Sequence, residues 1–399
     1  MPTLVDRIRR HLRPGALVAV GDGAGAPVGL GEALAEAAAS VGGVRLLLGW
    51  CLEPPVPLDD ARAFTDVRSF MGGYALRQAV ADGRVRYLPV RLGSLPALLA
   101  GPLRPDVVVT SLAPGPAGPV WGSEVAWLPA AVETGAVVLA EVNHGLPRAA
   151  GDRPVARVTV VSETDRPPMQ VPTPPPGPEA AAIGETVARL IPRGAALQFG
   201  PGWIGDAVCR ALQVPVAIDS GVLADAVVDL DERGLLVGTP RAAYLTGTGR
   251  LYRWADGKHL LARVEETHDL SRLARHGSFV AVNTALEVDV RGQVNVERSG
   301  EAVVGGIGGH ADYALAASRC PRGLSILVVP SRRRGRSTLV EQVDGGVSTP
   351  RSDIDIVVTE HGTADLRARS DDERAAVLRP LWPADAAVPP RGGGKSWIN

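Results

Sequence analysis

The stretch AAIGETVARLIPRGAALQFGPGWIGDAVCRAL, residues 181–212, contains the pattern that decides the fold. In its first part Ile183, Val187 and Leu190 recur at helical spacing. A Pro/Gly turn, a short apolar run and a glycine loop follow, and a second helical segment comes last. This order predicts a helix–turn–strand–loop–helix unit, which is typical of α/β proteins.

The N-terminus repeats this order in LVDRIRRHLRPGALVAVGDGAGAPVGLGEALAEAA, residues 4–38. Two copies indicate a duplicated fold, because a solenoid array needs more repeats. Short apolar runs separated by helical stretches favour mainly parallel sheets with helices on both faces; these runs are RLLLGW, VRYLPV, DVVVTSL and AVVLAEV. The proline-rich segment at 166–179 fits neither a helix interior nor a central strand. We therefore expect an α/β domain at 1–170, a linker at 171–178 and a second α/β domain at 179–399.

Composition excludes several classes of function. The chain has 399 residues, of which 45% are hydrophobic, so it can bury a sizeable core. A net charge of -1 gives no electrostatic argument for binding nucleic acid or a charged membrane surface. Cys51, Cys209 and Cys320 are far apart, no run spans a bilayer, and no signal segment is evident, so we expect a soluble cytoplasmic protein. The seven histidines lack paired metal-ligand spacing, and we expect no metal site.

Two glycine loops precede predicted helices. In LQFGPGWIGDAV, residues 197–208, Gly200 and Gly202 allow close backbone approach to the free N–H groups of a helix start. Such a place suits a phosphate or a developing oxyanion, and the alternative is a tight turn that binds nothing. In VVGGIGGHADYALAA, residues 303–317, a denser glycine run has the same context, and the alternatives are a backbone-lined site or a spacer.

The stretch AVNTALEVDVRGQVN, residues 281–295, alternates apolar and polar residues. This period predicts one β-strand with a buried and a polar face, and Gly292 marks a turn after it. Glu287 lies on the polar side, so the pattern leaves two interpretations open: a solvated surface carboxylate or a carboxylate that takes part in catalysis. Glutamate is a mediocre strand former, which favours the second interpretation slightly.

Taken together, these segments resemble the acetyl-CoA hydrolase/transferase family, which belongs to the class I coenzyme A transferases. The resemblance runs through most of the chain. In the N-terminal half it rests on GAPVGLGEAL, VRYLPVRLGSLPALL and VVLAEVNHGLPR. In the C-terminal half it rests on LQFGPG, AVVDLDERGLLVG, FVAVNTALEVDVRGQVNVE, GGIGGHADY and DIVVTEHGTADLR.

The resemblance implies two related α/β domains, each with a ribose-phosphate-isomerase-like open sheet, in a homo-oligomer. It also implies that Glu287 is the nucleophile that attacks an acyl-CoA thioester, passing through an acyl-glutamyl anhydride and a glutamyl-CoA thioester. The loops would face the thioester and its oxyanion; their glycines are Gly200, Gly202, Gly305, Gly306, Gly308 and Gly309. Acyl-CoA and a small carboxylate would be the substrates, with no tightly bound cofactor. The usual glutamate pKa of about 4.3 leaves room for burial to raise it by roughly two units without neutralising Glu287 at pH 7.

The chain departs from the family pattern at two positions. His310 stands where the family usually has glutamine, and Gly221 stands where it usually has glutamate. Both positions, together with Asn283, are candidates for the acyl pocket. The departures leave the acyl group open. They also leave open three activities: a CoA-transferase, an acyl-CoA hydrolase that uses the same glutamate, and a non-catalytic acyl-CoA-binding homologue.

Overall fold

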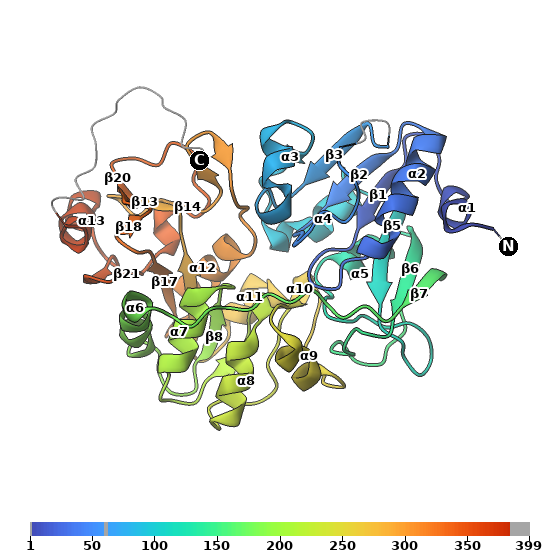
Figure 1. The fold of residues 1–399 in the computed structure, drawn as a ribbon. Coiled ribbons are helices and arrows are strands. Elements are labelled where there is room, and N and C mark those ends of the chain that lie inside the picture. Colours follow the sequence, from blue (N-terminus) through green and yellow to red (C-terminus); the bar gives the residue numbers. More distant parts are fainter. Residues whose placement is uncertain (1, 60–62, 384–399) are drawn as a thin grey trace. The chain divides into compact units, whose positions relative to one another are not determined.

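A computed structural model describes residues 2–59 and 63–383, so the outermost ends of both predicted domains lie outside the described residues. The chain forms two compact units (Figure 1). Unit 1 comprises Met1–Pro172 and Arg241–Thr267, and unit 2 comprises Thr173–Pro240 and His268–Asn399. Each unit is described by itself below.

Unit 1 is built on a seven-stranded sheet with the order β4-β3-β2-β1-β5-β6-β7, in which every neighbouring pair is parallel. All residues of β1 and β5 are buried, as expected for strands covered on both faces. The strands are β1 (Leu17–Val20), β2 (Arg45–Leu48), β3 (Asp66–Ser69), β4 (Arg86–Tyr87), β5 (Val107–Leu112), β6 (Val137–Asn143) and β7 (Val158–Thr164). The four predicted apolar runs thus overlap β2, β4, β5 and β6, and the predicted parallel sheet is confirmed.

Short helices connect these strands. Thr3 caps the first of them, because its side chain accepts the Asp6 N–H and the Asp6 carboxylate accepts the Thr3 N–H. One face of the sheet packs with the first three helices through Ile8, Leu30 and Leu34. The helices of the first segment are α1 (Leu4–Arg9), η1 (Val28–Leu30), α2 (Gly31–Val41), η2 (Tyr74–Leu76), α3 (Arg77–Ala81), η3 (Leu92–Ser94), α4 (Leu95–Ala100) and α5 (Leu128–Glu133).

The segment Arg241–Thr267 corrects the predicted domain boundary, because it was expected in the C-terminal domain and instead packs within unit 1. Its backbone pairs with the chain segment that precedes α5. Val125 N–H donates to Ala243 C=O (3.0 Å), and Leu245 N–H donates to Ser123 C=O (2.8 Å). A pattern read along the chain does not reveal such a return, since it reports local periodicity only. The segment holds β11 (Tyr244–Leu245), α9 (Gly249–Ala255) and α10 (Val264–Thr267).

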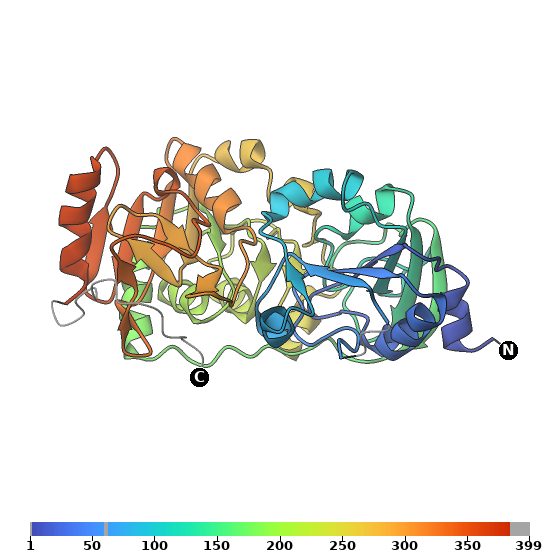
Figure 2. The same ribbon diagram turned by 90° about the horizontal axis from the view of Figure 1, so that it is seen from above.

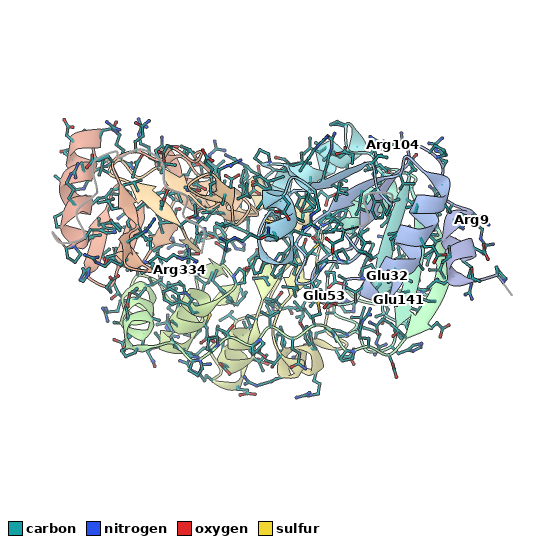
Figure 3. All side chains as sticks on the ribbon, turned by 45° about the horizontal axis from the view of Figure 1, so that its top comes forward. Arg9, Glu32, Glu53, Arg104, Glu141 and Arg334 are labelled. Atoms are coloured by element: carbon teal, nitrogen blue, oxygen red, sulfur yellow. The ribbon has the colours of Figure 1, made fainter. Side chains whose placement is uncertain are left out.

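The start of the proline-rich connection is also held by unit 1. Arg166 Nη2 bonds Glu141 Oε1 at 2.8 Å, and Figure 3 labels this glutamate. Met169 N–H donates to Ala24 C=O (2.8 Å) and Val171 N–H donates to Gly247 C=O (2.9 Å). The connection ends where Pro178 opens the first helix of unit 2, a position at which the missing N–H costs no hydrogen bond.

Unit 2 contains a six-stranded sheet with the order β22-β21-β17-β12-β8-β9. Its pairs are parallel except for β22, which runs antiparallel to β21. The strands are β8 (Ala196–Phe199), β9 (Ala217–Ile218), β12 (Phe279–Thr284), β17 (Leu324–Val328), β21 (Ile356–Thr359) and β22 (Gly362–Asp365). Smaller strands are β10 (Val222–Leu223), β13 (Glu287–Asp289), β14 (Val294–Asn295), β15 (Arg298–Ser299), β16 (Ala302–Val303), β18 (Arg332–Arg333), β19 (Arg336–Ser337) and β20 (Leu339–Val340).

Two helices of unit 2 pack against strands of its six-stranded sheet. The residues Tyr313 and Ala316 of α12 pack on Phe279 and Ala281 of β12. At the edge of the sheet, α13 packs against β22 (Figure 2). The helices of unit 2 are α6 (Pro178–Ala188), α7 (Trp203–Ala211), α8 (Asp225–Glu232), α11 (Leu270–Ala274), α12 (His310–Arg319), η4 (Arg351–Asp353), α13 (Asp371–Leu378) and η5 (Arg379–Leu381).

Both units open with the predicted order of helix, strand, glycine loop and helix: α1, β1 and α2 in unit 1, and α6, β8 and α7 in unit 2. The three cysteines are buried and unpaired. Across the part of the chain that the structure describes, no helix combines the length and apolarity needed to cross a membrane. The cytoplasmic location stays a prediction.

Candidate active site

The sheet of unit 2 has a topological switch point between β8 and β12. From β8 the chain places β9 on one side, and it later places β12, β17 and β21 on the other. Because connections leave in opposite directions there, the carboxyl ends of these two strands flank the place where open α/β sheets bind ligands. Gln198 lies in β8 and the loop at Gly200 follows that strand, while Asn283 is the residue before the last one of β12.

The predicted single strand over residues 281–290 is wrong. β12 ends at Thr284, and β13 belongs to another sheet, with β14 antiparallel and β20 parallel to it. The turn at Gly292 is confirmed, with φ of 98°. Asp289 stabilises that turn, since its Oδ1 accepts the N–H groups of Arg291 and Gln293. The polar positions of this stretch do not form a solvent-exposed face, because Asn283 and Asp289 are buried.

Glu287 begins β13 and is half-buried. The side chain of Asn295, opposite it on β14, donates from Nδ2 to Glu287 Oε2 at 3.2 Å. Burial raises the pKa of Glu287 and the Asp344 charge raises it further, while the Asn295 hydrogen bond opposes the rise. Glu287 is thus a partly desolvated carboxylate with a fixed donor, which does not fit a fully solvated surface group.

Asn295 is itself rigidly held. Its Oδ1 accepts the N–H groups of Glu297 and Arg298, both at 3.0 Å, and its Nδ2 also donates to Arg298 C=O at 2.7 Å. The Glu297 side chain accepts the Ser348 hydroxyl at 2.5 Å. Sequence reasoning did not single out Asn295, although the hairpin register around Gly292 places it opposite Glu287.

The glycine run at 305–309 connects to this hairpin. Glu297 C=O accepts the N–H groups of Val304 (2.7 Å) and Gly305 (3.1 Å). A Cβ at Gly305 would lie 2.4 Å from Val296 C=O, so only glycine fits there. The run ends at Gly309, which caps α12, so it leads into a helix start as predicted. The chain from Glu287 through Asn295 to Glu297 therefore links the carboxylate to the glycine run.

The loop after β8 lies at the end of β12, because Gly200 N–H donates to Val282 C=O at 3.3 Å. A Cβ at Gly200 or Gly202 would meet no atom within 4 Å, so the space beside this loop is open. Gly202 has φ of 109° and precedes α7, and its conformation explains the glycine.

Two of the three acyl-pocket candidates, His310 and Gly221, lie at the first turn of α12. His310 is its first residue, is buried, and bonds Thr349 Oγ1 through Nδ1 at 2.7 Å. Burial lowers the pKa of His310 to about 4, so its imidazole is neutral at pH 7. A Cβ at Gly221 would lie 3.4 Å from the Tyr313 hydroxyl, one turn along the same helix. Asn283 accepts a hydrogen bond from Gln198 Nε2 at 3.3 Å, a partner that sequence reasoning missed.

Comparison with known proteins gives this geometry a context. The family model described as "Acetyl-CoA hydrolase/transferase C-terminal domain" matches residues 247–381. This range contains Glu287 and the glycine run. The 4-hydroxybutyrate coenzyme A transferase of Clostridium kluyveri is 30% identical over 338 residues, which cover 79% of each chain. The chain belongs to the acetyl-CoA hydrolase/transferase family.

Two further relatives show the range of this family. An acetyl-CoA hydrolase of Saccharomyces cerevisiae is 33% identical over 198 residues, which cover 46% of this chain and 36% of the relative. The crystal structure of RipA from Yersinia pestis superposes with a TM-score of 0.85 at 25% identity, covering 96% of this chain and 94% of RipA. The acetyl-CoA hydrolase/transferase family thus includes enzymes named as transferases and as hydrolases.

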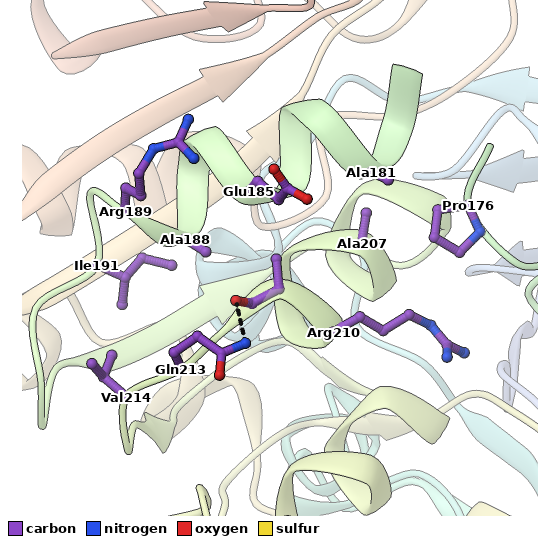
Figure 4. Close-up of a pocket in the computed structure, with 11 residues that line it drawn as sticks. Pro176, Ala181, Glu185, Ala188, Arg189, Ile191, Ala207, Arg210, Gln213 and Val214 are labelled. Atoms are coloured by element: carbon purple, nitrogen blue, oxygen red, sulfur yellow. Dashed lines mark hydrogen bonds between the residues drawn. The ribbon is translucent and has the colours of Figure 1, made fainter. Parts of the chain in front are cut away.

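A hollow of about 730 Å³ lies between α6 and α7 of this family member (Figure 4). Small apolar side chains such as Ala181 and Ala207 line it, with Glu185, Arg189 and Arg210 at its border. The residues that line it include none of the predicted site residues. We therefore do not assign it to the chemistry of Glu287.

A second buried polar cluster lies in unit 1 and was not anticipated from the sequence. The order of its sheet puts the switch point between β1 and β5. Asp22 follows β1, and its Oδ2 accepts from Trp50 N–H (2.9 Å), Trp127 Nε1 (3.0 Å) and the Tyr244 hydroxyl (3.1 Å). Burial raises the pKa of Asp22 to about 6. Glu124 is also buried, and burial raises its pKa to about 8, with a further contribution from the Asp22 charge.

Proposed function

We propose that this protein is an acyl-CoA:carboxylate coenzyme A transferase with Glu287 as its nucleophile. The observation that carries the proposal is the state of that carboxylate: half-buried, bonded by Asn295, and connected through Glu297 to a glycine run at a helix start. Partial desolvation makes a carboxylate a better nucleophile, and the Asn295 donor opposes its protonation.

The reaction begins when a Glu287 oxygen attacks the thioester carbonyl carbon. A C–O bond forms, the C–S bond breaks, and coenzyme A leaves as the thiolate, giving an acyl-glutamyl anhydride. The thiolate then attacks the glutamyl carbonyl, which releases the first carboxylate and forms glutamyl-CoA. A second carboxylate attacks that thioester, and thiolate attack on the new acyl group releases the product and free Glu287. No net proton transfer and no nucleotide are required.

Each attack places negative charge on a carbonyl oxygen, and backbone N–H groups of a glycine loop suit this charge. The N–H groups of Gly200 and Gly305 are already bonded to Val282 and Glu297. In this proposal the donors therefore come from residues after Gly305, at Gly306, Gly308 and Gly309, and from the helix start after Gly202. Losing one such donor typically lowers the rate by roughly 10²–10³-fold.

A hydrolase is the second candidate, favoured by the hydrolase named among the relatives. Water would then intercept the anhydride or the glutamyl thioester. The proposal further includes a ribose-phosphate-isomerase-like sheet in each unit, a homo-oligomer, and acyl-CoA with a small carboxylate as the substrates, with no tightly bound cofactor.

The experiment incubates the protein with an acyl-CoA and a panel of free carboxylates. A transferase converts donor into new acyl-CoA at a rate that depends on the added carboxylate, and mass spectrometry detects a covalent adduct on the peptide that holds Glu287. Release of free thiol that no carboxylate changes would establish the hydrolase instead. Glu301→Gln is the matched control, since Glu301 is an exposed glutamate in the same segment. An adduct that persists in Glu287→Gln would disprove the assignment.

A further inference from the structure

Two amide side chains lie buried side by side at the switch point of unit 2. Gln198 is 3% exposed and Asn283 is 6% exposed. The strand register places Gln198 beside Ala281, and Asn283 is two residues further along β12. Both side chains project from the face of the sheet that α12 covers, since Phe279 and Ala281 of the same alternation pack on that helix.

The hydrogen bond between the two amides uses only part of their capacity. Gln198 Nε2 donates to Asn283 Oδ1 at 3.3 Å, and within the described chain Gln198 Oε1 and Asn283 Nδ2 are buried without a partner. Rotating both amides by 180° reverses this bond and again leaves one acceptor and one donor. One unbonded donor and one unbonded acceptor therefore remain whichever way the two amides are oriented. Buried polar atoms without partners are uncommon in native proteins and call for an explanation.

His310 adds a third buried atom of this kind. Its Nδ1 bonds Thr349, and its Nε2 has no partner among the described residues. The ring lies at the carbonyl of Thr284, the residue that follows Asn283. Open space adjoins the cluster, because a Cβ at Gly200 or Gly308 would meet no atom within 4 Å. The two amides thus carry unused hydrogen-bonding capacity near the carboxyl end of β12, and the His310 ring lies at the next carbonyl along that strand.

We propose that Gln198, Asn283 and His310 form a subsite for a neutral group that both donates and accepts a hydrogen bond: a hydroxyl or an amide. A carboxylate only accepts and an ammonium only donates, so neither satisfies an amide pair that offers one donor and one acceptor. This inference rests on the proposed function, because the group belongs to the acyl-CoA that Glu287 attacks. Glu287 is four positions after Asn283, so their Cα atoms lie within about 14 Å of each other.

The substrate offers this group from two sources. One is a hydroxyl on the acyl chain, and the other is an amide in the pantetheine arm of coenzyme A. Both lie a few bonds from the thioester carbon, on opposite sides of it. A comparison of substrates that carry one, both or neither distinguishes the two sources.

The test uses the double variant Gln198→Met/Asn283→Leu. Replacing both partners of a buried hydrogen bond with apolar side chains of similar shape leaves no unpaired group, so we expect the variant to fold. Gln213→Met is the matched control, because Gln213 is an exposed glutamine of the same unit. The kcat/KM is measured with 4-hydroxybutyryl-CoA, butyryl-CoA, and the butyryl thioesters of N-acetylcysteamine and of ethanethiol.

If the subsite binds an acyl hydroxyl, the double variant loses roughly 10- to 100-fold with 4-hydroxybutyryl-CoA alone, the range of one or two neutral hydrogen bonds. If it binds the amide, the loss appears with both CoA esters and the N-acetylcysteamine ester, and the ethanethiol ester is unaffected. A common factor for all four thioesters, or no loss with any of them, would overturn the subsite.

Failure of the proposed function gives a different result, since the wild-type protein then turns over none of the four thioesters. In that case calorimetry decides, with free coenzyme A and 4-hydroxybutyrate as probes. A Kd at least 10-fold weaker in the double variant for one probe supports the subsite. Equal Kd values in the wild type and the variant would overturn it.

Discussion

Each unit places carboxyl groups near the switch point of its large sheet, and the two units hold them in different ways. At the switch point of unit 1, Asp22 and Glu124 are almost fully buried. Beyond the switch point of unit 2, Glu287 is half-buried and bonded by Asn295. Burial raises the pKa of Glu124 to about 8, so this side chain is largely protonated at neutral pH. Glu124 also has fixed donors, since its Oε2 accepts from the Ser123 hydroxyl and the Gly25 N–H. The comparison therefore teaches that the degree of burial, and not residue type or a fixed donor, favours Glu287 over Glu124 as the proposed nucleophile.

The largest expected effect separates these two glutamates directly. Glu287→Gln should lower acyl exchange by roughly four to six orders of magnitude, as loss of a catalytic nucleophile does in other enzymes. Glu124→Gln should lower it less than about tenfold, because the neutral amide resembles the protonated carboxyl it replaces. Steady-state kinetics on both variants, with thermal unfolding as a check of folding, measures the contrast. Equal losses would end the distinction between the two sites.

The buried carboxyl groups of unit 1 should make stability depend on pH. A carboxyl whose pKa rises on folding stabilises the folded state below its unfolded pKa, and this contribution is lost as the pH rises. For Glu124 the window runs from the usual 4.5 to about 8, and for Asp22 from 3.8 to about 6. We expect these two carboxyl groups to lower the unfolding free energy by on the order of a few kcal/mol between pH 5 and pH 8, while the lowered pKa values of the buried His268 and His310 act in the opposite direction below pH 6.5.

Denaturant unfolding at several pH values checks this expectation. Glu124→Gln should flatten the curve above pH 6, whereas Glu36→Gln, which changes an exposed glutamate of unit 1, should leave it unchanged. Two other titratable groups face these carboxyl groups, Tyr244 and Cys51, and burial raises the pKa of each. A Glu124→Gln curve that falls as steeply above pH 6 as the wild-type curve would contradict the unit 1 half of the comparison.

Two glycines extend the comparison to the backbone. A Cβ at Gly305 would lie 2.4 Å from Val296 C=O, so Gly305→Ala must shift the run that leads to α12. We expect about a 10²-fold loss of kcat, the size of effect that follows a displacement of about 1 Å at a reacting centre. In unit 1, a Cβ at Gly25 would lie 2.5 Å from Glu124 Oε1, so Gly25→Ala should lower the unfolding temperature more than kcat. The opposite ranking of the two variants would argue against this division of roles.

The smallest expected effects concern the pKa of Glu287. Burial and the Asp344 charge raise this pKa, and the Asn295 donor lowers it. Asn295→Asp replaces the donor by a negative charge and keeps the oxygen that accepts the Glu297 N–H, so the acidic limb of the pH–rate profile should move up by about one unit. Asp344→Asn should move it down by a few tenths of a unit, since Asp344 is exposed and screened. Shifts in the same direction in both variants would contradict this assignment of causes.

Much of the architecture was predictable from local patterns. The apolar runs gave the parallel strands, and the glycine loops lead into helices as expected. The strand through Glu287 was predicted incorrectly, because residues 281–290 alternate continuously while the backbone changes sheets after Thr284. Alternation records which side a side chain faces and not which strands pair with it. The return of Arg241–Thr267 to unit 1 was missed for a related reason, since its partners lie more than a hundred residues away.

The amino-acid order alone determined the α/β class, the duplicated opening of the two units, the glycine loops and the family resemblance, because each depends on neighbours a few positions apart. The tertiary structure alone decided that Asn295 bonds Glu287, that Gln198 meets Asn283, and that Glu124 is buried beside Asp22. The ionisation of a carboxyl group and the unused capacity of an amide depend on distance and solvent access. Both are properties of the packed fold.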